Sequence, residues 1–159
     1  MADEKEPMTV DGKRKLDEEL KQLMTVDRPD IIKAIEIARG HGDLKENADY
    51  SAAKERQSFI EGRIGYINDK LARAQVIDIR ALKSDKILFG ATVVLEDQET
   101  NKRVTYQIVG VDEADIKNGK VGVTSPIARA LIAKSKGDEV VVHAPKGEIR
   151  YDVIAISYL

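Results

Sequence analysis

The sequence predicts an α+β protein, with a long antiparallel coiled-coil hairpin followed by a small antiparallel β-sheet domain that carries one short helix. Three observations predict this class. Apolar residues of the first half recur at spacings of three and four, which is the period of one helix face. The second half instead contains short β-branched runs separated by turn residues. Two nearby glycines, Gly40 and Gly42, mark a tight connection between the two helical stretches.

The first helical pattern covers residues 9–39. Its apolar face falls into two groups, Leu16, Leu20 and Leu23, then Ile31, Ile35 and Ala38. Pro29 lies between the groups, and a proline either kinks a helix or opens a new segment in its first turn. Thr9 and Asp11 are both suitable caps for the start of the helix.

The second helical pattern covers residues 47–74. Its heptad-like stripe consists of Ile60, Ile64, Ile67, Leu71 and Ala74. Ala48, Ala52 and Phe59 are expected to extend this stripe toward the helix start. Two helices joined by a short loop fold back as an antiparallel pair. At about 1.5 Å per residue, each helix is on the order of 40 Å long, so the pair forms a rod rather than a globule.

The second half is predicted to contain five short strands at residues 91–95, 104–109, 120–124, 139–143 and 149–157. The first two strands form a hairpin around residues 97–102. Ser125 and Pro126 are the expected N-cap and first residue of a helix over residues 127–134. Residues 76–86 resemble a linker, and we place the domain boundary there, giving domains 1–78 and 79–159.

Composition excludes several classes of protein. The net charge is −2, so no basic excess drives non-specific nucleic-acid binding. The chain contains no cysteine, which excludes disulfides, thiolate metal sites and a cysteine nucleophile. The charged start MADEKEP is no secretory signal, and no run of about 20 apolar residues predicts a membrane span. We therefore expect a cytoplasmic protein.

The connection between the helices carries the main candidate site, the carboxylates Asp43 and Glu46. One interpretation is structural: Asp43 as N-cap and Glu46 three residues later resemble a capping box, and negative charge suits a helix N-terminus. The other is functional, because two carboxylates at the end of a rod can supply oxygen ligands to Mg²⁺. They cannot complete its shell of six, so a partner or substrate would supply the rest. The two interpretations are compatible.

Other candidates have simpler explanations. His41 could act as a general base, but an exposed loop histidine explains it better, and His143 is expected to be structural. A row of basic residues lies near or behind the tip: Lys45, Lys54, Arg56 and Arg63. A solvated helix face accounts for them, and a track for a nucleic-acid strand is the alternative.

Six motifs occur in order along the chain: RPDII at 28–32, GDLKENADY at 42–50, EGRI at 61–64, AQVID at 74–78, DEAD at 112–115 and SPIARAL at 125–131. With these motifs the sequence resembles the bacterial Gre family of transcript cleavage factors, in its GreA type. The match runs nearly end to end. The tip motif and the weak basic character favour the GreA type over the more basic GreB type.

The resemblance implies a coiled-coil hairpin and an FKBP-like domain that binds RNA polymerase at the mouth of its secondary channel. The hairpin would pass down that channel to the active site. There, Asp43 and Glu46 would help to hold a Mg²⁺ ion shared with the polymerase, while the protein has no cofactor of its own. The polymerase would then cut the 3′ end of backtracked nascent RNA, so the chain itself would be an accessory factor, not an enzyme.

The resemblance also implies that Lys45 and Lys54 face the RNA. A monomer is expected to be the functional state. One alternative is a channel-binding inhibitor of RNA polymerase from the same superfamily. Another is a stand-alone prolyl isomerase or nuclease, although the strand region has few aromatic residues to line an isomerase pocket.

Overall fold

The computed structural model describes residues 5–42, 47–82 and 84–159. The chain forms two compact units, one of residues 13–74 and the other of residues 5–12 together with 75–159. From the sequence we expected the boundary after residue 78, with the N-terminal residues in the hairpin domain. In the structure residues 5–12 belong to the second unit, a long-range arrangement that local periodicity does not report.

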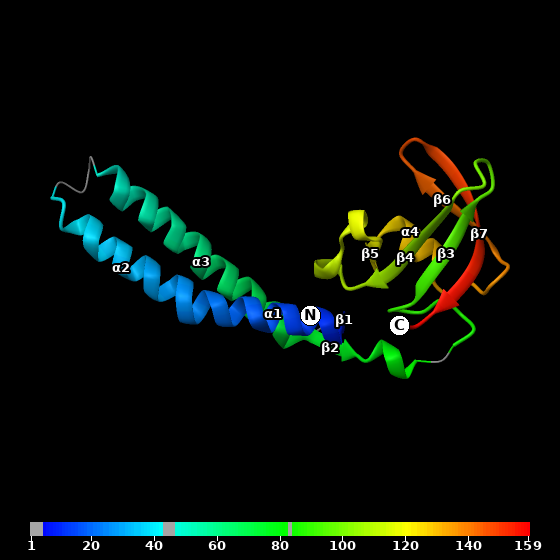
Figure 1. The fold of residues 1–159 in the computed structure, drawn as a ribbon, viewed down its shortest axis with the longest axis horizontal. Helices are drawn as coiled ribbons and strands as arrows, with labels where there is room; N and C mark the ends of the chain where they lie inside the picture. The colour runs from blue at the N-terminus through cyan, green and yellow to red at the C-terminus, as the bar shows by residue number, and fades with distance from the viewer. Residues whose placement is uncertain (1–4, 43–46, 83) are drawn as a thin grey trace. The chain divides into compact units, whose positions relative to one another are not determined.

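The first unit is a hairpin of two antiparallel arms (Figure 1). One arm runs through α1 (Val10–Gln22), a π-helical turn (Leu23–Asp27) and α2 (Arg28–Arg39). The other arm is α3 (Ala48–Arg73). Pro29 lies in the first turn of α2, directly after the π-helical turn. The backbone is helical at Asp27 and Arg28 and no side chain caps α2, so the arm continues as a helix up to the proline rather than starting a separately capped segment there.

The facing stripes of the two arms are buried, as the periodicity predicts. The buried residues of the hairpin are Leu16, Leu23, Ile31, Ile35, Ala38, Ala53, Ile60, Ile64 and Ile67. The predicted extension of the stripe was wrong: Ala48 and Ala52 are exposed, and Phe59 is 72% exposed. The seven-residue step back from Ile60 reaches Ala53, whereas Phe59 lies about 100° around the helix from Ile60.

Two short strands were missed by the sequence analysis. β1 (Glu6–Thr9) pairs with β2 (Ala74–Ile77) as a two-stranded sheet. The residues that we assigned to a linker therefore begin with strand and continue into a short 3₁₀ turn at Ile79–Ala81. Four-residue strands lack the length for a clear two-residue alternation, so their pairing is decided by contacts between distant parts of the chain.

The second unit is built around a five-stranded sheet in the order β5-β4-β3-β7-β6 (Figure 1). Its strands are β3 (Thr92–Asp97), β4 (Arg103–Val109), β5 (Lys120–Gly122), β6 (Glu139–Ala144) and β7 (Gly147–Ser157). Four strands are antiparallel, but β5 runs parallel to β4. The sheet is therefore mixed, which corrects the antiparallel sheet that we predicted.

The parallel pairing has a local cause. Two 3₁₀ turns, Val111–Glu113 and Ile116–Asn118, lie in the connection between β4 and β5. This connection brings the chain back beside β4, so that β5 runs in the same direction as β4. A two-residue hairpin turn would instead have reversed the direction. The predicted hairpin between β3 and β4 is confirmed, with Asp97 Oδ1 accepting from Glu99 N at 2.8 Å.

One short helix, α4 (Pro126–Leu131), accompanies the sheet. Ser125 Oγ accepts from Ala128 N at 3.3 Å, so Ser125 is the N-cap, as predicted. The helix ends at Leu131 rather than at residue 134, because Ile132 leaves the helical conformation with ψ of 135°. Its buried residues join an aliphatic core of Ile87, Ala91, Val93, Leu95, Ile108, Val121, Ala128, Leu131, Val140, Val142, Tyr151 and Val153.

Candidate functional site

The candidate site of the first unit is the connection between α2 and α3. Asp43, Lys45 and Glu46 lie outside the described residues, so the geometry of the site is read from the chain on either side. The described flanks are residues 39–42 at the end of α2 and residues 47–50 at the start of α3. Both flanks show how the sequence turns between the two arms.

On the α2 side, the helix ends in a tightened final turn. Gly40 N donates to Ile37 O at 3.1 Å, and His41 N donates to Ala38 O at 3.1 Å. Gly42 follows with φ of +106°, a conformation that residues with a Cβ rarely adopt. The second glycine of the connection is therefore required by the backbone.

On the α3 side, Asn47 is the N-cap. Its Oδ1 accepts from Tyr50 N at 3.0 Å, and its backbone is extended with φ of −87° and ψ of 97°. This corrects the capping-box interpretation, in which Asp43 would have been the N-cap. Asparagine is among the strongest N-cap residues, so the signal was present in the sequence, but we had placed Asn47 inside the helix. Capping of α3 therefore does not account for Asp43 and Glu46.

The other charged groups near the connection are exposed. Lys54 Nζ donates to Gln57 Oε1 at 3.2 Å on the surface of α3. His41 Nδ1 lies 3.9 Å from Asp49 Oδ2, and both side chains are more than half exposed. This exposure fits the exposed loop histidine that the sequence favoured over a general base.

Arg63, one of the basic residues behind the tip, is engaged within the hairpin. Its Nε and Nη2 donate to the two carboxylate oxygens of Glu19 at 2.6 and 2.8 Å. This contact lowers the pKa of the Glu19 carboxyl, chiefly through the hydrogen bond. A bidentate pair fixes both side chains, so Arg63 serves the packing of the two arms.

A second bidentate pair joins the arms closer to the tip. Arg28 Nε and Nη2 donate to Glu61 at 2.8 Å each, across 33 positions of the sequence. The hydrogen bond to Arg28 lowers the pKa of the Glu61 carboxyl. Both pairs are contacts between the two arms of the hairpin, away from the connection.

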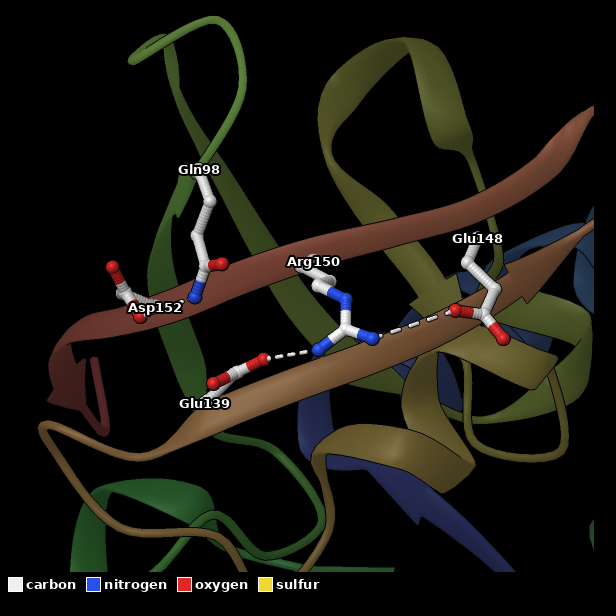
Figure 2. Close-up of polar contacts among 5 residues, drawn as sticks. All are labelled: Gln98, Glu139, Glu148, Arg150 and Asp152. Atoms are coloured by element: carbon white, nitrogen blue, oxygen red, sulfur yellow. Dashed lines mark hydrogen bonds and ion pairs between the residues drawn. The ribbon is translucent and has the colours of Figure 1, made fainter.

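The second unit carries its own cluster of charges on the polar face of the sheet (Figure 2). Arg150 lies between Glu139 and Glu148, at 2.9 and 3.8 Å, and Gln98 donates to Asp152 at 2.9 Å. Gln98 follows β3, whereas the four charged residues lie on β6 and β7 and alternate there with buried residues such as Val140 and Tyr151. Partly exposed pairs of this kind are the ordinary cross-strand contacts of a solvated sheet face.

Within the described parts of the chain, no group of three or more histidine, cysteine or acidic residues is placed to hold a metal ion. Among the same described residues, no helix combines the length and the hydropathy of a membrane-spanning segment.

The fold and the site define a class of two-unit proteins. One unit is a two-helix arm whose connecting segment has an acidic sequence, and the other is a mixed sheet with a solvated polar face. Models of the "Transcription elongation factor, N-terminal" and "Transcription elongation factor, GreA/GreB, C-term" families match residues 6–76 and 82–158. The two matches fall on the hairpin and on the sheet. The chain belongs to the GreA/GreB family of transcription elongation factors.

Curated relatives match over nearly the whole chain. The "Transcription elongation factor GreA" of Hyphomonas neptunium is 59% identical over 98% of this chain and 99% of its own length. The protein of the same name from Thioalkalivibrio sulfidiphilus is 58% identical with the same coverage. Among solved structures, the GreA factor homolog 1 of Thermus thermophilus is 26% identical, covers 96% of this chain and 99% of its own, and has a TM-score of 0.45.

Proposed function

We propose that this protein is an accessory factor of RNA polymerase that stimulates cleavage of the 3′ end of backtracked nascent RNA. The hairpin enters the secondary channel and brings Asp43 and Glu46 to the polymerase active site. The polymerase then performs the cleavage, and the shortened transcript can be extended again. The chain is thus no enzyme by itself, and a monomer is sufficient for this role.

The observation that carries the proposal is the assignment of the N-cap. Asn47 caps α3, and its bond to Tyr50 N completes the first turn without either acid. A structural role that would have explained Asp43 and Glu46 is therefore occupied by another residue. Two carboxylates three positions apart in one short connection then need a different reason, and a shared cation is such a reason.

The donor chemistry suits Mg²⁺, which prefers carboxylate oxygens and takes six ligands. Asp43 and Glu46 supply only a part of that shell. The remaining ligands would come from the polymerase and from water, so the ion is shared. When bound, such an ion stabilises the charge that develops on the cleaved phosphate.

Lys54 is a candidate contact to RNA, because its ammonium group is exposed on an early turn of α3 and its described hydrogen bond is only to the neutral Gln57. Lys45 is the second candidate, on sequence grounds alone. We assign docking to the second unit, where Val111 and Ile116 are exposed by 53% and 64%. Both side chains leave apolar area in water that a contact with a partner would bury.

The test is a cleavage assay on stalled, backtracked polymerase complexes with the wild type, Asp43→Ala and Glu46→Ala. We expect the wild type to accelerate RNA shortening and each variant to lose the acceleration, with polymerase binding unchanged in a competition assay. Ile116→Lys is the complementary variant, for which we expect weaker binding and an unchanged cleavage rate at saturation. Full stimulation by both acid variants would refute the role of the acids.

The same assay separates the alternatives. Slower nucleotide addition without RNA shortening would favour the channel-binding inhibitor. RNA shortening or prolyl isomerisation by the purified chain without polymerase would favour a stand-alone enzyme.

A further inference from the structure

The side chain of Asn47 makes two hydrogen bonds that join the ends of the two arms. Its Oδ1 accepts from Tyr50 N at 3.0 Å, which caps α3. Its Nδ2 donates to Ala38 O at 2.6 Å, nine positions earlier in the last turn of α2. One partly buried amide thus caps the first turn of one helix and also donates to a carbonyl in the last turn of the other.

This pair of bonds needs both halves of an amide. Aspartate and serine would cap the helix equally well through an oxygen. Aspartate has no donor, however, and its charge would lie against the carbonyl of Ala38 at the negative end of the α2 dipole. Serine is too short to span both helix ends while its oxygen caps α3. Among common cap residues, asparagine alone provides a cap and a bridge together.

The bridge closes the connection at its base. Ala38 O also accepts from His41 N at 3.1 Å, so a single carbonyl holds the outgoing chain and the incoming cap. The Asn47 amide thus holds together Ala38 and Asn47, the described residues on either side of the connection. Closing the ends of a loop removes much of its conformational freedom.

We infer that Asn47 is a positioning residue, which holds the base of the connection so that the acids reach the polymerase in one arrangement. This inference rests on the proposed function and adds to it a residue outside the acidic pair. A positioning role and a purely structural role for Asn47 affect different measured quantities. A positioning residue changes the rate of cleavage within the bound complex, whereas a loss of stability changes the concentration of folded factor.

The decisive variant is Asn47→Asp, which keeps the size of the side chain and the capping oxygen but removes the donor to Ala38 O. Asn47→Ser is the second variant, with a cap and no bridge. Glu61→Ala is the matched control, because it removes a different contact between the arms, the bidentate pair with Arg28. For each we measure the cleavage rate at saturating factor, the half-saturating concentration, helix content and amide exchange at Tyr50 and His41.

We expect Asn47→Asp and Asn47→Ser to lower the saturating cleavage rate by about tenfold to a hundredfold, with less than about a twofold change in half-saturating concentration. Exchange should accelerate at His41 while Tyr50 remains protected. Glu61→Ala should keep the saturating rate. Wild-type cleavage by Asn47→Asp, or an equal loss in Glu61→Ala, would overturn the inference alone. A wild type that does not stimulate cleavage would overturn the proposed function, and this inference with it.

Discussion

The carboxylate of Glu113 receives both the backbone N–H and the hydroxyl of Thr9, which lies 104 positions earlier in the chain. A third hydrogen bond to the same carboxylate, from Gly110 N at 2.9 Å, further restricts its orientation. Thr9 is nearly fully buried, with 4% of its surface exposed. One acidic side chain of the second unit therefore holds the N-terminal strand β1.

Loss of the Glu113 carboxylate should destabilise this attachment. In Glu113→Ala, the N–H groups of Thr9 and Gly110 lose their acceptor in a partly buried place, at a cost of about 1–3 kcal/mol. Thermal unfolding measures this cost, and hydrogen exchange should show faster exchange at Thr9 than in the wild type. Unchanged exchange at Thr9 would contradict the arrangement.

A double-mutant cycle tests the same contact from the other side. A Cβ added to Gly12 would overlap the Glu113 carboxylate. Gly12→Ala should therefore destabilise the wild type, because Glu113 must move away from Thr9. In the Glu113→Ala background the same change should be neutral or stabilising, since alanine favours the helix and the obstacle is gone. Additive effects of the two changes on the free energy of unfolding would show that the contact is absent in solution.

The two bidentate pairs of the hairpin predict a loss of stability in acid. The pKa values of Glu19 and Glu61 are lowered in the folded state by their arginine partners, from an ordinary value of 4.5. A carboxyl with a lowered folded pKa stabilises the fold fully above its unfolded pKa, and this contribution disappears as pH falls through the folded pKa. Below about pH 4.5, the temperature at which the helices unfold should therefore decrease.

Circular dichroism at 222 nm during heating, from pH 7 to pH 3, measures this effect. The variants Glu19→Gln and Glu61→Gln should melt at lower temperature than the wild type at pH 7 and lose less stability on acidification. If the wild type and the variant with both changes lose the same amount of stability on acidification, the acid sensitivity arises from other groups. Both carboxylates are largely solvated, so the contribution of each pair is small.

Two glycines within α3 are predicted to be replaceable with a gain in stability. Gly62 and Gly65 have no atom within 4 Å of an added Cβ and have no positive φ. Each change to alanine should therefore stabilise the hairpin by about 0.5–1 kcal/mol through helix propensity. Gly42→Ala is the matched control, since φ of +106° makes the same change unfavourable there despite open space. A destabilised Gly62→Ala would indicate a contact that the described structure lacks.

Burial distinguishes two large side chains of α3 that periodicity grouped together. Ile67 is fully buried, whereas Phe59 is 72% exposed. We expect Ile67→Ala to cost about 2–5 kcal/mol of unfolding free energy, since it removes buried methylene groups and leaves a cavity. Phe59→Ala should change that free energy by less than about 0.5 kcal/mol. Denaturant unfolding of both variants gives the comparison, and equal costs would place Phe59 back on the buried face.

The sequence by itself determined the features that depend on neighbouring residues. The hydrophobic spacing around Ile60, Ile64 and Ile67 identified the buried face of α3, and Ser125 before a proline identified the start of α4. The order of short β-branched runs was sufficient to predict most of the sheet. These signals are local, because periodicity and capping act over one or two turns of the chain.

Only the tertiary structure decided the features that join distant segments. The burial of Thr9 against Glu113, the parallel pairing of β5 and the two-stranded sheet of β1 and β2 depend on contacts far apart in sequence. The role of Asn47 was also decided there, because an N-cap can be predicted locally but a bridge to Ala38 requires both helix ends to meet. The physical reason is that a hydrogen bond across a closed loop exists only once the rest of the fold has brought its partners together.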